Sequence, residues 1–304
     1  MRIRFAFLTF VGLVVCVSAV VAATPAPLTL TASTNANALH PGGVSLLLVR
    51  ASQPLDAVEG YAFGKPVRFW HDADARKWFG LVSAGLDAKP GPYPVAISGV
   101  GPAGTASVTV SLRVKPKTFE TRHLKVDPQF VNPPLGEADR IASEQKLMAE
   151  LFAQVSKERY WRGRFDPPVP GLPTSSFGRL SVLNGQPRGR HQGADFRAPA
   201  DTPVYAPNGG QVVLASDLYF SGNTVIIDHG LGMFSLLAHL SRITVAQGAF
   251  VARGERLGES GATGRVTGPH LHWALRLGDA SVDPLALMDA VAALDDEPRS
   301  DRSQ

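Results

Sequence analysis

Two short patterns in the last part of the chain combine histidine with aspartate or with a second histidine. His191 and Asp195 are four residues apart, and His270 and His272 are two residues apart. Side chains two residues apart share a face only on a β-strand, so we expect His270 and His272 to point into one site from a strand. Gly193 and the prolines that follow it argue against a helix around the first pair. These spacings favour β structure at both patterns.

A third histidine, His239, lies between the two patterns. Imidazole and carboxylate groups are ligands of catalytic zinc, which takes three protein ligands and leaves a fourth position to water. Either pattern alone is explained as well by ordinary polar positions near turns. Five of the eight histidines, however, lie between residues 191 and 272, with the two pairs at the ends of that span. This conjunction predicts a metal site.

Six motifs surround these residues in a fixed order. They are Ser176–Arg179, His191–Phe196, Gly222–Gly230, Ala238–Ser241, Gly261–Gly264 and Thr267–His272. This order, from about Ser175 to Pro284, resembles that of the lysostaphin-type (LytM-like) zinc metalloendopeptidases, many of which are peptidoglycan hydrolases. Every functional position of the family pattern is filled.

The resemblance implies a role for each matching residue. His191, Asp195 and His272 match the three zinc ligands, and His239 and His270 match the two histidines that flank the water on the zinc. Spacing alone does not say which of His270 and His272 binds the metal. The implied chemistry is peptide-bond hydrolysis with one zinc per chain and a histidine as general base. The implied fold is an antiparallel β groove, a duplicated hybrid motif, with zinc on its floor.

The start of the chain predicts export. Two arginines precede an apolar run from Phe5 to about Val21, and small residues follow, as is typical of a secretory signal over residues 1–23. An uncleaved membrane anchor is the alternative, although the run is near the lower limit for spanning a bilayer. Cleavage removes Cys16, the single cysteine, and with it any disulfide. We expect a periplasmic or secreted protein at the cell wall, with no stable membrane span after cleavage.

The next region, residues 26–115, contains short apolar or alternating runs separated by turn residues. Regularly spaced short strands with turn signals predict an immunoglobulin-like β-sandwich. We interpret His40, His71 and His123 as surface residues because no partner motif surrounds them. We interpret His229 as a turn residue outside the site.

Prolines divide the rest of the chain. A helical connector is predicted over residues 133–162, with an amphipathic helix from Glu137 to about Glu158 that packs against one of the domains. The peptidase domain is predicted over residues 168–288 as nearly all β, followed by a polar, disordered tail over residues 289–304. The fold class is therefore mainly β, with two domains and a helical connector.

The filled ligand set favours an enzyme, a zinc metalloendopeptidase that hydrolyses the peptide cross-links of peptidoglycan. Two alternatives stay open: a metal-free activator of a partner wall hydrolase, and a secreted protease acting on proteins. Lysine and arginine number 30 against 26 aspartates and glutamates, and they are scattered along the chain, which argues against nucleic acid as a partner. The sequence indicates neither the oligomeric state nor the peptide bond that is cleaved.

Overall fold

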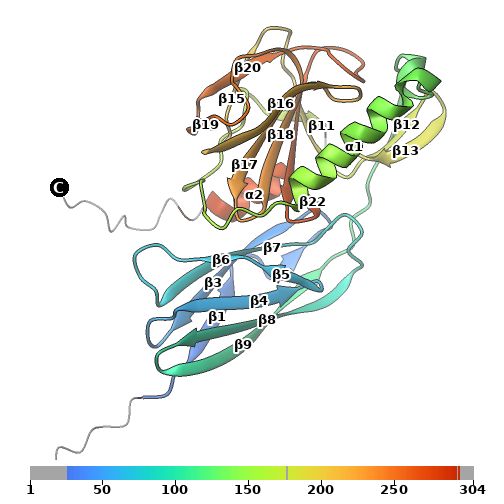
Figure 1. Cartoon of the computed structure of the whole chain (residues 1–304). Coiled ribbons are helices and arrows are strands. Elements are labelled where there is room, and N and C mark those ends of the chain that lie inside the picture. Colours follow the sequence, from blue (N-terminus) through green and yellow to red (C-terminus); the bar gives the residue numbers. More distant parts are fainter. Residues whose placement is uncertain (1–25, 176, 293, 295–304) are drawn as a thin grey trace, which may run out of the picture.

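The computed structural model describes residues 26–175, 177–292 and 294. The predicted signal over residues 1–23 lies outside the described residues, as does the part of the predicted tail from 295 to 304. Figure 1 shows two β-rich regions, one above the other, joined by a connector that ends in a long helix. Among the described residues, no helix is long and apolar enough to cross a membrane, and this includes the connector helix.

The first region consists of two sheets with apolar side chains between them. Their strand orders are β1-β3-β7-β6 and β2-β9-β8-β4-β5. Residues of β4 are alternately exposed and buried, as expected for a strand with one face on a core. Leu47, Val49, Ile97 and Leu112 from both sheets are buried in one cluster. The region is β as predicted, and its immunoglobulin-like topology stays a prediction. The strands are β1 (Leu30–Thr34), β2 (Ala38–Leu39), β3 (Val44–Ala51), β4 (Ala57–Ala62), β5 (Lys65–Val67), β6 (Phe69–Trp70), β7 (Lys77–Ser83), β8 (Gly91–Gly101) and β9 (Gly104–Val114).

The connector begins with a strand that pairs with the second region. β10 (Thr121–Leu124) runs parallel to β12 (Leu180–Leu183), and β12 pairs antiparallel with β13 (Gln186–Arg190). Two short 3-10 helices follow β10, namely η1 (Pro128–Phe130) and η2 (Leu135–Glu137). The connector therefore supplies one strand of a sheet whose other two strands belong to the second region.

The connector helix, α1 (Ala138–Ala153), packs on the second region. Its Phe152 ring lies 5.4 Å from that of Phe234, edge to face. The helix ends about five residues earlier than the predicted Glu158 because the next backbone groups bond to the sheet instead. The oxygen of Ser156 accepts a hydrogen bond from the backbone of Leu231 at 2.9 Å. These bonds replace the helical ones that a longer α1 would need.

The second region is built on a large antiparallel sheet with the central order β11-β14-β21-β18-β17-β16-β19. β17 is buried along almost its whole length because both of its faces are covered. α1 covers one face, where Leu214, Ile226 and Phe234 contact the helix, and the main core covers the other. The strands are β11 (Pro173–Ser175), β14 (Gly193–Phe196), β15 (Pro203–Tyr205), β16 (Gly210–Leu218), β17 (Gly222–Gly230), β18 (Met233–Ile243), β19 (Phe250–Val251), β20 (Arg256–Ser260), β21 (Leu271–Leu277) and β22 (Ala280–Val282).

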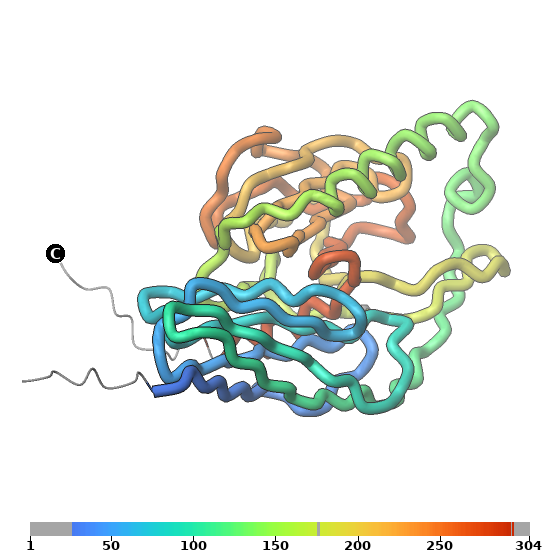
Figure 2. The backbone as a smooth tube through the Cα atoms, turned by 60° about the horizontal axis from the view of Figure 1, so that its bottom comes forward, coloured from blue at the N-terminus to red at the C-terminus, as the bar shows by residue number. Residues whose placement is uncertain are grey.

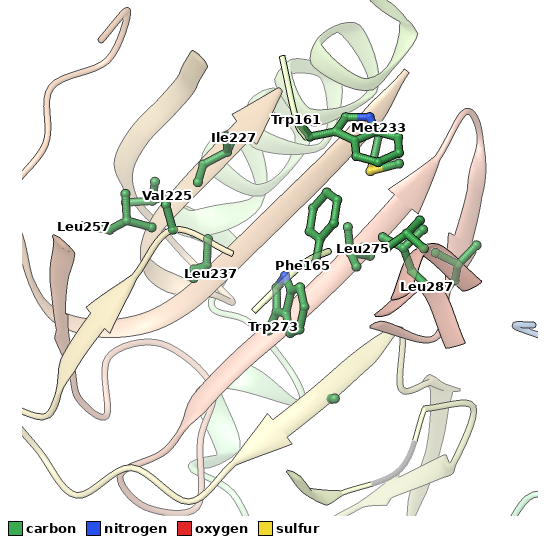
Figure 3. Packing of buried hydrophobic residues seen from close by; sticks show 14 of the residues in the cluster. Trp161, Phe165, Val225, Ile227, Met233, Leu237, Leu257, Trp273, Leu275 and Leu287 are labelled. Carbon is green, nitrogen blue, oxygen red and sulfur yellow. The ribbon is translucent and has the colours of Figure 1, made fainter. Parts of the chain in front are cut away.

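The main core contains residues from before the predicted start of the peptidase domain at residue 168. Figure 3 shows Trp161 and Phe165 lying among side chains of the sheet, with Trp273 and Leu275 of β21 close by. Trp161 and Trp273 are completely buried. Trp161 and Phe165 therefore belong to the second region's core, although they precede the predicted domain boundary.

The second region ends with α2 (Pro284–Ala292). The sequence predicts a disordered tail from residue 289, but the helix continues through residue 292. Leu287 and Val291, four positions apart on the helix, are both fully buried in the main core. Their burial explains why the helix extends past the predicted boundary.

The two regions share a core. Trp70 of the first region lies edge to face against Trp161, with ring centroids 5.2 Å apart. The guanidinium of Arg159 lies 5.2 Å and 5.1 Å from these two rings and pairs with Asp72. Figure 2 shows the regions stacked closely, with the connector running along one edge. The aromatic contacts and the ion pair hold the two regions against each other.

Candidate functional site

Three of the predicted site residues come from neighbouring strand ends. Asp195 on β14 and His272 on β21 are direct cross-strand partners, so their side chains share one face of the sheet. His191 follows the end of β13 and precedes β14. Its backbone N–H donates to the oxygen of Arg179, and its oxygen accepts from the N–H of Gly178, both at 2.8 Å. The local β pairing thus orients all three residues.

Their ligand atoms converge on one point. Nε2 of His191 lies 3.0 Å from Oδ1 of Asp195 and 3.0 Å from Nδ1 of His272. Nδ1 of His272 lies 2.9 Å from the same carboxylate oxygen. The three side chains are half-buried, with 17–18% of their surface exposed. In the part of the chain that the structure describes, no other group of histidine, cysteine or acidic residues converges in this way.

This donor set fits one zinc ion. A tetrahedral ion with bonds of about 2.0–2.1 Å sets its ligand atoms roughly 3.3 Å apart, close to the observed 2.9–3.0 Å. Two imidazoles and a carboxylate are ligands typical of catalytic zinc with an open fourth position. His191, Asp195 and His272 are consistent with a single zinc.

The electrostatics favour the protonation states that metal binding requires. Burial works to raise the pKa of Asp195, but the hydrogen bonds from His191 and His272 outweigh it and hold that pKa well below its usual range. Burial lowers the pKa of His272. An ionised carboxylate and a neutral imidazole are the forms that bind a metal ion.

His239 lies at a bulge in β18. There the strand changes partner, because Ala238 still pairs with His272 of β21 whereas Leu240 pairs with Ser260 of β20. The backbone of His239 has a φ of 67°, a left-handed conformation that is uncommon for a residue with a side chain. A bulge of this kind re-aims a side chain next to a site. It brings the ring of His239 to 6.0 Å from that of His272.

Two backbone oxygens hold His239 in this conformation. Its backbone N–H donates to the oxygen of Ser221, and its Nδ1 donates to the oxygen of Thr263, both at 2.9 Å. Because a carbonyl oxygen only accepts, Nδ1 carries the proton and Nε2 has the free lone pair. Burial, followed by the charges of His272 and His270, lowers the pKa of His239 to about 3.

His270 stands beside His239, with ring centroids 4.9 Å apart. Its Nδ1 donates to the oxygen of Gly268 at 2.9 Å, which again leaves Nε2 with the lone pair. That Nε2 lies 3.7 Å from Oδ1 of Asp195, so it faces the three converging ligand atoms. The structure therefore brings all five predicted site residues together.

Sequence reasoning missed the backbone supports of His239. The loop that carries Thr263 can approach His239 only because two glycines, one in each neighbouring segment, leave room for close backbone contact. A Cβ on Gly222 would lie 2.4 Å from the carbonyl carbon of Thr263, and one on Gly264 would lie 2.4 Å from the nitrogen of Gly222. Both glycines have positive φ, 62° and 74°. The glycines of the Gly222–Gly230 and Gly261–Gly264 motifs are the sequence signal that could have indicated this contact.

The interpretation of His229 as a turn residue was wrong. It lies in β17 and is completely buried. Nδ1 donates to the oxygen of Gly209 at 2.7 Å, and Nε2 lies 2.8 Å from the hydroxyl of Ser235. Burial lowers the pKa of His229 to about 4. It is a satisfied core histidine outside the site, whereas His40, His71 and His123 are exposed as predicted.

Comparisons of the sequence with known proteins are consistent with a peptidase site of this geometry. Residues 189–284 match the profile of Peptidase family M23. The chain is 49% identical over 85 residues to Peptidoglycan DD-endopeptidase ShyA of Vibrio cholerae serotype O1, covering 28% of this chain and 20% of that protein. It is 42% identical over 97 residues to DD-carboxypeptidase/endopeptidase Mpg of Neisseria meningitidis serogroup B, covering 32% of this chain and 22% of that protein. The chain thus spans about a fifth of the length of the curated relatives it matches.

One solved structure matches over a much greater extent. A crystal structure from Pseudomonas aeruginosa, described as an M23 peptidase, superposes with a TM-score of 0.61 and 33% sequence identity. The match covers 82% of this chain and 94% of that chain, so it includes residues from both β-rich regions. The family profile lies on the residues that form the site, and the solved structure extends the likeness to nearly the whole described chain. This chain belongs to peptidase family M23.

Proposed function

We propose that this protein is a zinc metalloendopeptidase that hydrolyses the peptide cross-links of bacterial peptidoglycan. The observation that carries the proposal is the convergence of three ligand atoms, from His191, Asp195 and His272, beside two histidines that each keep Nε2 free. The substrate class is supported by relatives whose names describe peptidoglycan DD-endopeptidases. A substrate in the wall requires export, for which residues 1–23 are the predicted signal.

The three converging residues would hold one zinc. Zinc held there would polarise the scissile carbonyl and lower the pKa of a water molecule to about 7. His270 takes a proton from the attacking water at Nε2 and passes it to the leaving amine. In its protonated form it also donates a hydrogen bond to the developing oxyanion.

His239 has a different part in this mechanism. Its low pKa keeps the ring neutral, and its Nδ1–H is donated to the backbone oxygen of Thr263. Nε2 is therefore an acceptor only, and it orients the attacking water by accepting a hydrogen bond from it. The rigid backbone around His239 fixes the direction of that acceptor, which contributes to catalysis through positioning.

Digestion of purified, cross-linked peptidoglycan with the mature protein tests the proposal. We expect cross-linked dimers to disappear and monomers to appear, identified by mass, with one zinc per chain by elemental analysis. The matched control is His191→Ala, which should lose both zinc and activity. A wild-type protein that takes up no zinc when refolded with it, yet stimulates a separate hydrolase, would refute the enzyme and support an activator.

A further inference from the structure

The loop between β20 and β21 carries an arginine next to the supports of His239. Arg265 follows Thr263 by two positions. Its backbone N–H donates to the oxygen of Phe220 at 2.8 Å, and its guanidinium lies 4.9 Å from the ring of Phe220. Phe220 directly precedes Ser221, the second backbone support of His239. Arg265 is therefore fixed to the same two segments that hold a site histidine in place.

The charge of Arg265 is not neutralised within the described chain. No carboxylate of the described residues forms an ion pair with it. Burial, and then the positive charge of Arg188, lower the pKa of Arg265, as expected for a cation that has lost water and faces a like charge. Arg242 of β18 and Arg256 of β20 differ, because both pair with Glu259, at 3.3 Å and 2.6 Å.

Arg188 also lacks an acidic partner among the described residues. Its Nη2 donates to the backbone oxygen of Val131 and, at 2.8 Å, to the side-chain oxygen of Gln186, and both acceptors are neutral. β13, which carries Arg188, leads directly into His191. The arginine pair, Arg188 and Arg265, thus comes from the two segments that present His191 and His270 to the site.

The connector joins these two segments. Arg188 donates to the oxygen of Val131, and the hydroxyl of Tyr219, which directly precedes Phe220, donates to the oxygen of Gln129 at 2.9 Å. Gln129 lies within the short helix η1 and Val131 directly follows it, so one turn of the connector contacts both segments. Neither guanidinium is paired with a carboxylate of the described residues, and a planar guanidinium binds a carboxylate through two parallel hydrogen bonds.

We propose that Arg265, supported by Arg188, binds a free carboxylate of the peptide substrate and so makes the enzyme selective for cross-links that carry one. This inference rests on the proposed function. The carboxylate comes either from the C-terminus of a peptide stem or from an acidic side chain within it. In both cases the bound carboxylate positions the scissile bond over the ligand atoms, and neutralising it by amidation removes the attraction.

The test compares Arg265→Gln with wild type on soluble cross-linked peptide dimers. Three substrates are used: one with free carboxylates, one amidated only at the C-terminus and one amidated only on the side chains. Loss of a hydrogen-bonded charge pair should lower kcat/KM on the free dimer by roughly 10- to 100-fold, chiefly through KM. The amidation that makes wild type and variant equal identifies which carboxylate is bound.

Two variants control the experiment. Arg256→Gln removes an exposed arginine of β20 that already pairs with Glu259, and it should behave as wild type on all three dimers. Arg265→Lys keeps the charge without the planar fork and should recover part of the loss. Zinc content should be unchanged in all of them. An equal loss on free and amidated dimers, or a wild type that does not distinguish them, would overturn the proposal.

A binding measurement separates this inference from the proposed function. A stem tetrapeptide with a free C-terminus and side-chain carboxylate, and its fully amidated form, are titrated calorimetrically into the zinc-loaded protein. Tighter binding of the free form that Arg265→Gln abolishes supports the carboxylate site even if wall digestion fails. Equal binding of both forms rejects the site even if digestion succeeds.

Discussion

Nδ1 of His239 lies 2.9 Å from the backbone oxygen of Thr263, and this bond crosses from β18 to the loop after β20. It determines which nitrogen of the ring carries the proton, and it holds a residue whose φ of 67° is itself unfavourable. The same loop continues to His270. One loop therefore controls the tautomer of one site histidine and the position of the other.

The first prediction concerns His239→Asn. Asparagine tolerates the left-handed backbone, so the bulge should be kept while the acceptor that orients the water is lost. We expect kcat to fall about tenfold, as for loss of one hydrogen bond, with zinc content unchanged. Steady-state kinetics and elemental analysis on the same preparation check this. Loss of zinc from this variant would show that His239 is a ligand.

The second prediction separates His270 from His272. His270→Ala should keep zinc and lower kcat by roughly 10²–10⁴, because it removes the proton-transfer group. His272→Ala should lose zinc on dialysis, because it removes one of three ligands. Zinc stoichiometry after dialysis, measured for both variants, decides the point. The opposite pattern would exchange the two roles.

The third prediction is a loss of stability in acid that depends on His229. Its pKa is about 4 in the folded protein against an ordinary value of 6.5, so the unfolded chain binds a proton that the fold does not. The free energy of unfolding should therefore fall as the pH drops below 6.5, by up to roughly 3 kcal/mol once the pH is below 4. Urea unfolding at a series of pH values measures this loss.

His229→Gln provides the control for this pH series. Glutamine keeps a donor and an acceptor toward Gly209 and Ser235 but does not titrate. The variant should be less stable than wild type at pH 7 and should lose less stability between pH 7 and pH 4. If the free energy of unfolding falls equally with pH in the two proteins, groups other than His229 account for the acid sensitivity.

The fourth prediction concerns where the catalytic part of the chain begins. A chain starting at residue 168 lacks Trp161 and Phe165, which are buried in the main core. We expect it to unfold without a cooperative transition, whereas a chain starting at residue 121, which keeps β10 and α1, should unfold cooperatively. In the full chain, Trp161→Ala should cost roughly 3–5 kcal/mol. Cooperative unfolding of the shorter chain would restore the boundary at residue 168.

The zinc-ligand patterns could be read from the sequence because they depend on local spacing. His270 and His272 lie two residues apart and both face the site, but only His272, the cross-strand partner of Asp195, joins the ligand cluster. Spacing could not choose between them, because the choice depends on the pairing of β14 with β21. The resemblance to a known family supplied that choice in advance.

Features that depend on distant backbone contacts could not be predicted. The early end of α1 reflects hydrogen bonds of Ser156 and Tyr160 with the end of β17 and the turn that follows it. The burial of His229 reflects partners at Gly209 and Ser235, which no pattern around His229 indicates. The same holds for Arg265, whose lack of an acidic partner among the described residues becomes visible only once the fold is known.

The parallel pairing of β10 with β12 bears on how proteins of this kind could be recombined. β10 belongs to the stretch of chain between the two regions, yet it is also the outer strand of the sheet that leads into His191. Exchanging the first region for another one, with the junction placed after residue 124, would delete a strand next to the site. The two halves are therefore not interchangeable modules, and a graft that preserves activity must carry residues 121–124 with the catalytic half.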